Sequence, residues 1–544
     1  GRLASVAWPP GLAMNLESPR KILVPGDTIG IIGAGISGLI CAKTMLEAGF
    51  RVAIFEKRSF LGGVWHAGYS NLAVQTDRNL YEIPDWPFPP TYPRCPDLEQ
   101  VRAYLATYAR HFGIMPHIHY NSEMKKLTEL KHRQSWRVTI EDTVTHVTTH
   151  REMDFVVICS GLFSVPNIPV IERRQLFKGP VLHSSEFNSR YLKSTAHQNV
   201  LVVGYGKSAI DCAMMCSKTA HEVTLLFRSA HWPIPETLFK VPVPQLLLNK
   251  LAHPLLPLYQ RPTFVERMIH FFLWPLVWLF WRVFEVLLSF GLDLSRCNIL
   301  PTARLEEDWF SGDFFWTPQF TEVIRQGHII PVTGELREFC SDGVILKTGE
   351  KLQVDLVVLA TGYKGSLSCT SYSKPFQELE AEEDGIWLYR HCIHPKLDNL
   401  AFVGFCASLC SPLTAFLVSQ WLCGVVRGDI TLPTKQQQLD EIENMKRWKR
   451  SFMPPKYFRA SVVNFHMGSF HDELLRDLEL DPTRGLGLVK QLLCMYTPLD
   501  YSTVGVEIAE RRRMSAESEE ASGASGEESC SPPVLRHRLS WPRQ

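Results

Sequence analysis

Two glycine loops, each set between an apolar run and a helical pattern, constrain the fold of this chain more than any other feature. The first loop follows the apolar run Ile29–Ile32 and reads G-x-G-x-x-G, with the residues Gly33, Ala34, Gly35, Ile36, Ser37 and Gly38. Helical spacing follows over Ser37–Ala48, and a β-branched run over Arg51–Phe55 leads to Glu56. Strand, turn, helix and strand in this order predict a β-α-β unit.

Each glycine of the first loop has a physical role in binding a dinucleotide. Gly33 allows a tight turn, Gly35 lets the backbone approach a pyrophosphate, and Gly38 lets helix and strand pack closely. The free N–H groups at the helix N-terminus favour phosphate, and Glu56 stands where a carboxylate accepts hydrogen bonds from a ribose diol. The context predicts a nucleotide site rather than a plain β-to-α turn. The following G-G-V-W stretch (Gly63, Val64 and Trp65 as site residues) predicts a second close approach to FAD.

The second loop repeats the pattern as G-x-G-x-x-A, with candidate site residues Gly204, Gly206, Ser208 and Ala209. The run Val200–Val203 precedes it, and helical spacing begins at Ser208. The next predicted strand ends without an acid and is followed by Arg228. Since an arginine there attracts a 2′-phosphate that a carboxylate would repel, the loop predicts an NADPH site. The alternative for Arg228 is a solvated surface charge.

Two such units predict an α/β fold with two Rossmann-like dinucleotide-binding domains and a flavoprotein that takes hydride from a nicotinamide. The 14 cysteines include no C-x-x-C pair, which argues against disulfide reduction and favours oxidase, dehydrogenase or monooxygenase chemistry. Scattered cysteines are typical of reduced cytosolic proteins. The 57 basic residues balance 56 acidic ones, so nothing indicates a nucleic-acid partner. No metal site is predicted.

Three further motifs occur in a fixed order around these loops. Phe177, Gly179, His183 and Phe187 have the spacing F-x-G-x-x-x-H-x-x-x-F just before the second loop. An aromatic-proline stretch covers Glu82–Pro93, and L-V-V-L-A-T-G-Y-K-G ends at Gly365. From about Asp27 to Arg427, this order resembles the class B flavin-dependent monooxygenases, which include the flavin-containing monooxygenases.

The resemblance implies a reaction and roles for residues. NADPH would reduce FAD, and the reduced flavin would add O₂ to give a C4a-hydroperoxyflavin that oxygenates the nitrogen or sulfur of a small amine or thioether. Phe177, Gly179 and His183 would lie at the hinge between the nucleotide domains and help to hold NADP⁺. Thr361 and Gly362 of the A-T-G-Y motif would contact the cofactor as well. The alternative for His183 is a satisfied linker histidine.

One position departs from the family pattern. Many members carry an asparagine near the flavin, about ten residues before the aspartate of the aromatic-proline loop, where this chain has Gln75, followed by Thr76. A glutamine also carries an amide donor and acceptor, so Gln75 is predicted to contact flavin or substrate as the catalytic candidate. The Q-T pair resembles a plant-type branch. The alternative for Gln75 is an ordinary polar loop residue.

The motifs also predict the division of the chain. The predicted parts are an FAD domain over 27–165, an NADPH domain over 170–334 with an apolar helical insertion over about 235–315, a second FAD-domain part over 335–430, a C-terminal helical region over 431–506 and a disordered tail over 507–544.

The stretch Met268–Leu292 is the most apolar in the chain. Pro275 interrupts its first half, and the uncharged run stops at Arg282. Its aromatic and basic content suits a helix in a membrane interface or a lid over a substrate tunnel; a buried helix and a membrane span are the alternatives. The protein is therefore expected in the cytoplasm, and peripheral contact to the endoplasmic reticulum membrane is predicted for this stretch.

Several functions remain open at this stage. Baeyer–Villiger insertion into a ketone is the nearest alternative, although no Trp-Pro or Trp-Asp follows Phe187. An uncoupled NADPH oxidase that releases H₂O₂ is another, and a membrane-docking scaffold without catalysis is a third. No oligomeric state follows from the sequence.

Overall fold

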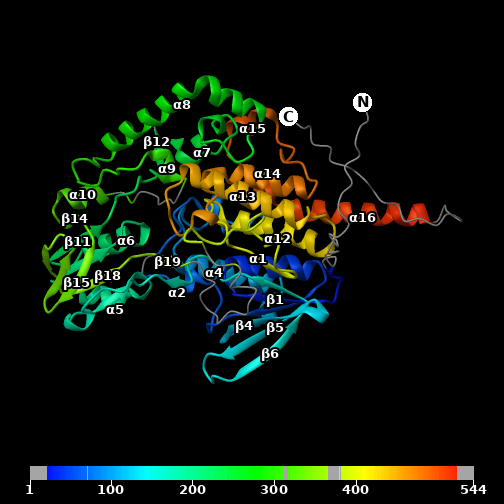
Figure 1. Cartoon of the computed structure of the whole chain (residues 1–544), viewed down its shortest axis with the longest axis horizontal. Coiled ribbons are helices and arrows are strands. Elements are labelled where there is room, and N and C mark those ends of the chain that lie inside the picture. The colour runs from blue at the N-terminus through cyan, green and yellow to red at the C-terminus, as the bar shows by residue number, and fades with distance from the viewer. Residues whose placement is uncertain are drawn as a thin grey trace, which may run out of the picture. The chain divides into compact units, whose positions relative to one another are not determined.

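The computed structural model describes residues 21–69, 72–238, 241–310, 317, 319–364, 379 and 382–523. The chain divides into two compact units, one ending at Tyr501 and the other beginning at Ser502. The first unit contains both predicted nucleotide domains. Figure 1 shows its elements, and the second unit is described separately below.

The FAD domain is built on a five-stranded parallel sheet with the order β20-β7-β1-β2-β3. Its strands are β1 (Thr28–Ile32), β2 (Arg51–Phe55), β3 (Ile118–His119), β7 (Phe155–Ile158) and β20 (Leu400–Phe402). Helices α1 (Ile36–Glu47) and α12 (Ser411–Arg427) pack together above this sheet, and the antiparallel strands β4 (Ser122–Leu130), β5 (Ser135–Asp142) and β6 (Thr148–Met153) lie below it (Figure 1). Strands covered on both faces become almost wholly apolar, as the buried run Phe155–Ile158 is.

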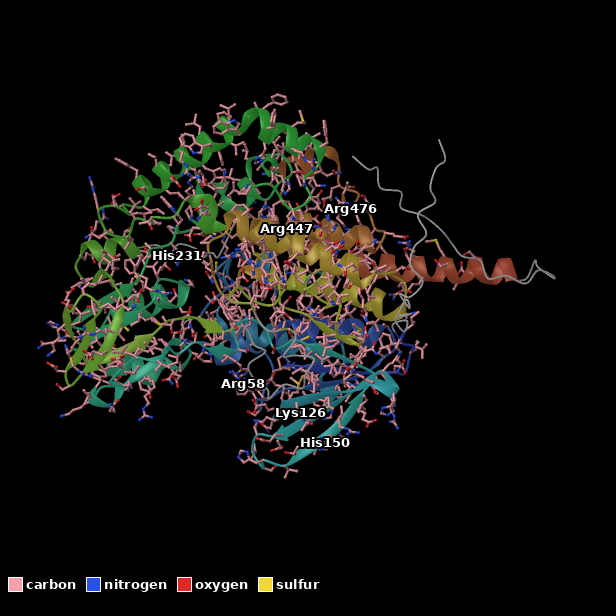
Figure 2. The ribbon with its side chains drawn as sticks, viewed as in Figure 1. Arg58, Lys126, His150, His231, Arg447 and Arg476 are labelled. Atoms are coloured by element: carbon pink, nitrogen blue, oxygen red, sulfur yellow. The ribbon has the colours of Figure 1, made fainter. Side chains whose placement is uncertain are left out.

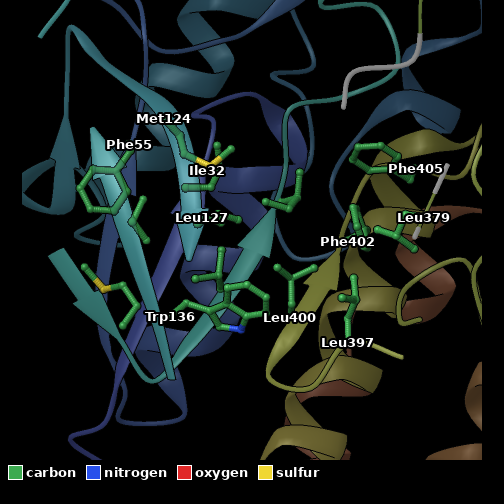
Figure 3. Close-up of a cluster of buried hydrophobic side chains, with 14 of the residues drawn as sticks. Ile32, Phe55, Met124, Leu127, Trp136, Leu379, Leu397, Leu400, Phe402 and Phe405 are labelled. Atoms are coloured by element: carbon green, nitrogen blue, oxygen red, sulfur yellow. The ribbon is translucent and has the colours of Figure 1, made fainter. Parts of the chain in front are cut away.

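The core of this domain joins distant parts of the sequence. Trp136 of β5 is buried among Ile32, Leu400 and Phe402 (Figure 3), and its indole Nε1 donates to the Asp398 carbonyl at 3.1 Å. The cluster contains side chains from β1 and β5, early in the chain, and from β20, late in the chain. It therefore stabilises the sheet only when the early and the late segment are both present. A later part of the chain therefore completes this sheet and its core.

The NADPH domain has its own five-stranded parallel sheet with the order β14-β11-β10-β18-β9. Its strands are β9 (Val181–His183), β10 (Asn199–Val203), β11 (Glu222–Phe227), β14 (Ile329–Thr333) and β18 (Leu356–Leu359). Helices α5 (Ser189–Ser194), α6 (Lys207–Cys216) and α10 (Phe320–Arg325) accompany it, with a meander of β15 (Leu336–Cys340), β16 (Gly343–Leu346) and β17 (Lys351–Gln353). The predicted fold class, two Rossmann-like domains, is confirmed.

One predicted boundary is wrong. The FAD domain was expected to resume at residue 335, yet β18 pairs in parallel with β10 of the NADPH sheet, with Val202 opposite Val358. The meander before it buries Phe339 and Val344 against Leu201. The chain returns to the FAD domain only after β18, because an A-T-G-Y motif placed at a strand end does not reveal which of two parallel sheets that strand joins.

Short elements connect the two sheets and complete the FAD lobe. Strand β8 (Val165–Pro166) pairs antiparallel with β19 (Tyr363–Lys364) between the domains. The remaining elements of this lobe are α2 (Val64–Ala67), α3 (Arg78–Tyr81) and α4 (Leu98–His111). Lys43 of α1 binds Asp85 of the aromatic-proline stretch at 2.5 Å, so that stretch is fixed against the FAD domain.

The insertion and the C-terminal helices form the upper part of the first unit in Figure 1. The insertion contains β12 (Thr237–Leu238), β13 (Val241–Pro242), α7 (Val243–Leu247), α8 (Phe264–Gly291) and α9 (Leu305–Trp309), and the C-terminal region contains α13 (Lys435–Phe452), α14 (Met467–Asp477) and α15 (Leu488–Leu493). His231, labelled in Figure 2, binds Asp308 at 2.9 Å, and Lys456 binds the same carboxylate at 3.2 Å. This ion cluster joins the NADPH domain, the insertion and the C-terminal region.

Two expectations about helices are corrected. Helix α8 continues through Pro275, which therefore does not interrupt it. In the second unit, α16 covers Val504–Gly523, so disorder from residue 507 is wrong up to Gly523. Alanine, glutamate and arginine are good helix formers, and Arg513 pairs with Glu517 at i, i+4. The expected disorder of 524–544 lies outside the described residues.

Candidate functional site

The first glycine loop has the close packing that its pattern predicts. Gly33 has φ +108°, and a Cβ on it would lie 2.8 Å from the Cys159 carbonyl oxygen. A Cβ on Gly38 would lie 2.0 Å from the Gly33 oxygen. No other residue type fits at these two positions, so they fix the turn between β1 and α1.

The space above this turn is kept open by two facing glycines. A Cβ on Gly63, whose φ is +59°, would approach the Cα of Gly35 to 3.1 Å, and the Gly62 N–H donates to the Ala34 carbonyl at 2.9 Å. Gly35 is the N-cap of α1 and provides no side-chain cap, so the N–H groups of the first turn are available for a phosphate. This cradle fits the pyrophosphate of FAD, as predicted for both loops.

The side chains around the cradle are held in place by the fold. Glu56 is buried, and its carboxylate accepts hydrogen bonds from the N–H of Ala34 at 2.8 Å and of Arg58 at 3.0 Å. Trp65 is buried, and its Nε1 donates to the Tyr81 hydroxyl at 3.1 Å. The ribose contact of Glu56 stays a prediction, with the carboxylate already positioned at the end of β2.

The second glycine loop is equally open toward a nucleotide. Gly204 has φ +132°, and its Cβ would lie 2.3 Å from the Ala360 oxygen, whereas a Cβ on Gly206 would meet no atom within 4 Å. Gly206 also caps α6 without a side chain, and Ala209 is buried beneath the turn. Arg228 is exposed directly after β11, where it can reach a 2′-phosphate; this contact stays a prediction.

The fingerprint segment packs inside the NADPH domain. A Cβ on Gly179 would lie 2.2 Å from the Asp355 carbonyl oxygen, and the ring of Phe177 stacks on Phe339 with centroids 5.5 Å apart. Phe187 is completely buried. Gly179 and the two phenylalanines therefore have structural roles here, which the spacing alone did not reveal.

His183 links the fingerprint to the A-T-G-Y motif. Its Nε2–H donates to the Gly362 carbonyl at 2.9 Å, and its Nδ1 accepts from the Ser185 N–H at 3.2 Å. Burial lowers the pKa of this imidazole, so the ring is neutral near pH 7. Thr361 Oγ1 donates to the Asn167 carbonyl at 2.5 Å. His183 thus fixes the 361–362 turn between the domains, and a direct contact with NADP⁺ stays a prediction.

A cavity of about 300 Å³ joins the two nucleotide domains. Gln75 and Thr76 line it from the FAD domain, and Lys207 lines it from the first turn of α6. Gln75 is exposed, and Thr76 Oγ1 is buried with no hydrogen-bond partner among the described residues. The predicted catalytic residue and Lys207 of the predicted NADPH loop therefore line the same cavity.

The rest of the cavity wall mixes polar and apolar side chains. Arg94 bridges two carboxylates, donating to Asp77 at 2.9 Å and pairing with Glu236 of the insertion. Cys95 donates to the Thr76 carbonyl at 3.5 Å, and Met495 contributes from the C-terminal region. The insertion and the C-terminal region thus each contribute part of the cavity wall.

A buried contact between the domains also escaped the sequence analysis. The Tyr69 hydroxyl donates to Asp211 Oδ2 at 2.7 Å, and Lys207 Nζ donates to Asp211 Oδ1 at 2.6 Å. Burial, followed by the Asp211 charge, raises the pKa of Tyr69, so the phenol keeps its proton. The signal available in the sequence was the i, i+4 spacing of Lys207 and Asp211 directly after the glycine loop.

The comparisons with known proteins agree with this geometry. A family described as flavin-binding monooxygenase-like matches residues 26–253 and 311–484. The chain belongs to this family. A putative flavin-containing monooxygenase 2 from Arabidopsis thaliana is 28% identical over 498 residues, covering 84% of this chain and 97% of the relative. Human flavin-containing monooxygenase 3 is 25% identical over 458 residues, covering 78% of this chain and 79% of the relative.

Solved structures show the same fold. Cyclohexanone monooxygenase from Rhodococcus bound to NADP⁺ has a TM-score of 0.64 at 15% identity and covers 84% of this chain and 98% of its own. The S-allyl-L-cysteine S-oxygenase from Allium sativum has a TM-score of 0.59 at 18% identity, covering 90% and 94%. The resemblance, its plant-type branch and the flavin monooxygenase class are thus confirmed, and the predicted cofactors, FAD and NADPH, agree with them.

Proposed function

We propose that this protein uses NADPH, FAD and O₂ to oxygenate the nitrogen or sulfur of a small amine or thioether. The observation that carries the proposal is the cavity that joins Gln75 and Thr76 to Lys207 at the second glycine loop. A monooxygenase needs hydride donor, flavin and substrate close together in a space that limits water. Lys207 of the second glycine loop and Gln75 of the FAD domain both line this cavity.

The residues divide the work between binding and positioning. The cradle of Gly35 and Gly63 would hold the FAD pyrophosphate, and Gly206 with Arg228 would hold the phosphates of NADPH. FAD, when bound, supplies the hydride acceptor and the activation of O₂. The protein contributes geometry and hydrogen bonds, so no side-chain nucleophile is required.

Gln75 is the proposed contact with flavin or substrate. Its amide donates and accepts hydrogen bonds, and its side chain lines the cavity. An amide placed beside the reacting atoms can hold activated oxygen long enough for transfer to a soft nucleophile. Poor placement would release H₂O₂ instead, so the amide position determines how much NADPH oxidation is coupled to product.

The test is a rapid-mixing experiment on the flavin-loaded protein. The enzyme is reduced with NADPH without air and mixed with oxygenated buffer, with and without an amine or thioether. A transient spectrum that decays faster with substrate, with oxygenated product, is expected. Immediate return of oxidised flavin with H₂O₂ would identify an oxidase, and an ester product from a ketone would identify Baeyer–Villiger chemistry.

Gln75→Asn gives a matched variant for the same experiment. Asparagine keeps the amide but draws it back by one methylene, so the ratio of product to H₂O₂ is expected to change while the rate of flavin reduction by NADPH does not. Asn79→Gln, at the same cavity wall, is the control for a generic change of amide length. Equal ratios in wild type and Gln75→Asn would refute the role of Gln75.

We further infer that the protein works in the cytoplasm with peripheral contact to a membrane of the endoplasmic reticulum type through Met268–Leu292. Supporting this, α8 is long and apolar enough to cross a membrane, and most of its apolar stretch is not buried in the protein. Fractionation of cells into soluble and microsomal protein tests this part of the proposal. A protein found only in the soluble fraction would refute it.

A further inference from the structure

Met495 places a thioether in the wall of the cavity. Within the described part of the chain it is the only methionine that lines the cavity together with Gln75. Its side chain is only 9% exposed, so an oxidant dissolved in the bulk solvent has poor access to the sulfur. A thioether is also the class of soft nucleophile that the proposed reaction oxygenates. Met495 therefore has the chemistry of a substrate and lies where a substrate is expected.

The segment that carries Met495 is held in place by hydrogen bonds. Thr497, which lines the same cavity, donates to Asp500 through its N–H at 2.8 Å and through its hydroxyl at 3.0 Å. Lys490 of α15 pairs with the other oxygen of Asp500 at 2.8 Å. The 3₁₀ turn Pro498–Tyr501 contacts α3, which also contributes to the cavity wall. The thioether is therefore fixed at this wall.

The described part of the cavity wall carries one other sulfur atom, in the thiol of Cys95. Partial burial, followed by the charge of Glu236, raises the pKa of this thiol, so it keeps its proton near pH 7. The thiolate, and not the thiol, is the nucleophilic form of cysteine. A thioether has no proton to lose, so its lone pair is available at any pH. Met495 is therefore the more reactive of the two sulfur side chains.

We propose that the enzyme oxygenates its own Met495 when no substrate occupies the cavity, and that the resulting methionine sulfoxide inhibits further turnover. The inference rests on the proposed function. One oxygen atom of O₂ forms a bond to the sulfur, the O–O bond breaks, and the other oxygen atom leaves as water. NADPH supplies two of the four electrons that O₂ takes up, and the sulfur supplies the other two. Each sulfoxide therefore consumes one NADPH, one proton and one O₂.

A sulfoxide at Met495 would change the chemical character of the cavity wall. Oxidation converts a flexible apolar side chain into a polar one whose new oxygen accepts hydrogen bonds. Thr76 Oγ1, on the same wall, is buried with no partner among the described residues, so the cavity contains an unused donor for such an oxygen. An amine or thioether would lose an apolar contact at this wall, and its affinity would fall. A bound substrate would protect Met495 by taking the oxygen itself.

The experiment is substrate-free turnover of the flavin-loaded full chain with NADPH in air, followed by peptide mass spectrometry. Catalase is present to destroy any H₂O₂ that is released. Met495 is expected to gain one oxygen atom about fivefold faster than Met514, or more, although Met514 is 59% exposed and Met495 only 9%. The reverse order is expected when H₂O₂ is added without NADPH and without catalase. Methyl phenyl sulfide, as the substrate probe, is expected to protect Met495.

Met495→Leu tests the consequence for turnover, because leucine keeps an apolar side chain of similar volume. Conversion of methyl phenyl sulfide is measured after increasing times of substrate-free turnover and is compared with the initial rate of the same protein. The wild-type rate is expected to fall in proportion to the sulfoxide at Met495, whereas the rate of Met495→Leu is expected to stay constant. Met514→Leu is the control and is expected to decline like the wild type.

The remaining outcomes separate this inference from the proposed function. Formation of methyl phenyl sulfoxide, with Met495 no more oxidised than Met514, would overturn the inference and leave the proposed function standing. Oxidation of Met495 that catalase prevents would overturn it in favour of attack by released H₂O₂. An equal decline of Met495→Leu and wild type would overturn the inhibition by the sulfoxide. A protein that oxidises neither NADPH nor methyl phenyl sulfide would contradict the proposed function, and the inference with it.

Discussion

The buried contact between Tyr69 and Asp211 predicts that Tyr69→Phe loosens the junction of the two nucleotide domains. Tyr69 comes from the FAD domain and is 4% exposed, and its hydroxyl lies 2.7 Å from a carboxylate of α6. A hydrogen bond to a charged group contributes about 1.5–3 kcal/mol. Lys207 remains paired with the other Asp211 oxygen, so the free energy lost in Tyr69→Phe is expected near the lower end of this range. Such a loss shifts the equilibrium between joined and separated domains about tenfold.

The assay compares NADPH consumed with H₂O₂ released. Lys207 belongs to the second glycine loop and lines the cavity. We therefore expect Tyr69→Phe to raise the KM for NADPH and the fraction of consumed NADPH that ends as H₂O₂, while flavin content stays unchanged. Tyr191→Phe, in α5 on the outside of the NADPH domain, controls for loss of a phenol and is expected to behave like wild type. Unchanged coupling and KM in Tyr69→Phe would refute the view that this contact positions the domains.

Three further predictions follow from the same structure. Gly179→Ala is expected to lower the unfolding free energy by about 1–3 kcal/mol, because its Cβ would meet the Asp355 oxygen, whereas Gly468→Ala has open space and is the control in thermal melts; equal melting temperatures would contradict this. Arg228→Ala is expected to raise the KM for NADPH about 10- to 100-fold without changing the KM for NADH, and an equal effect on both would exclude a 2′-phosphate contact. Burial lowers the pKa of His394 to about 4, so between about pH 6.5 and 4 only the unfolded state takes up this proton and stability falls as pH falls; His394→Gln should flatten that decline in melts at pH 7.5 and 5, and an unchanged slope would argue against it.

Local backbone requirements made the nucleotide loops predictable. Gly33 and Gly204 have positive φ, and a Cβ on either would meet a backbone carbonyl oxygen. Only glycine meets this requirement, so the G-x-G spacing predicts the turn. The strands and helices on either side follow from apolar runs of matching length. The two-domain fold and the tight glycine turns could therefore be predicted without any tertiary information.

Longer-range facts were not predictable, because they depend on which distant segments meet. The spacing of the fingerprint suggested residues that hold NADP⁺, yet Gly179 is required by the backbone of Asp355 and His183 bonds the Gly362 carbonyl. Tyr69 lies 142 positions from Asp211, and the i, i+4 spacing of Lys207 and Asp211 does not indicate that the partner is a tyrosine so far away in the chain. The wall of the cavity that Gln75 lines likewise includes side chains from the insertion and the C-terminal region.

The sequence by itself determined that this chain folds as two dinucleotide-binding domains in the order of a flavin monooxygenase, because glycine turns and strand–helix periodicity are local properties. Only the tertiary structure decided that β18 joins the NADPH sheet, that Tyr69 joins the domains, and that Arg282 and Glu285 of α8 bond Glu306 and Leu305 of α9. In each case the observed contact joins a residue to a partner in another secondary-structure element. Side-chain pairing across such distances depends on how the sheets and helices pack, which no local pattern encodes.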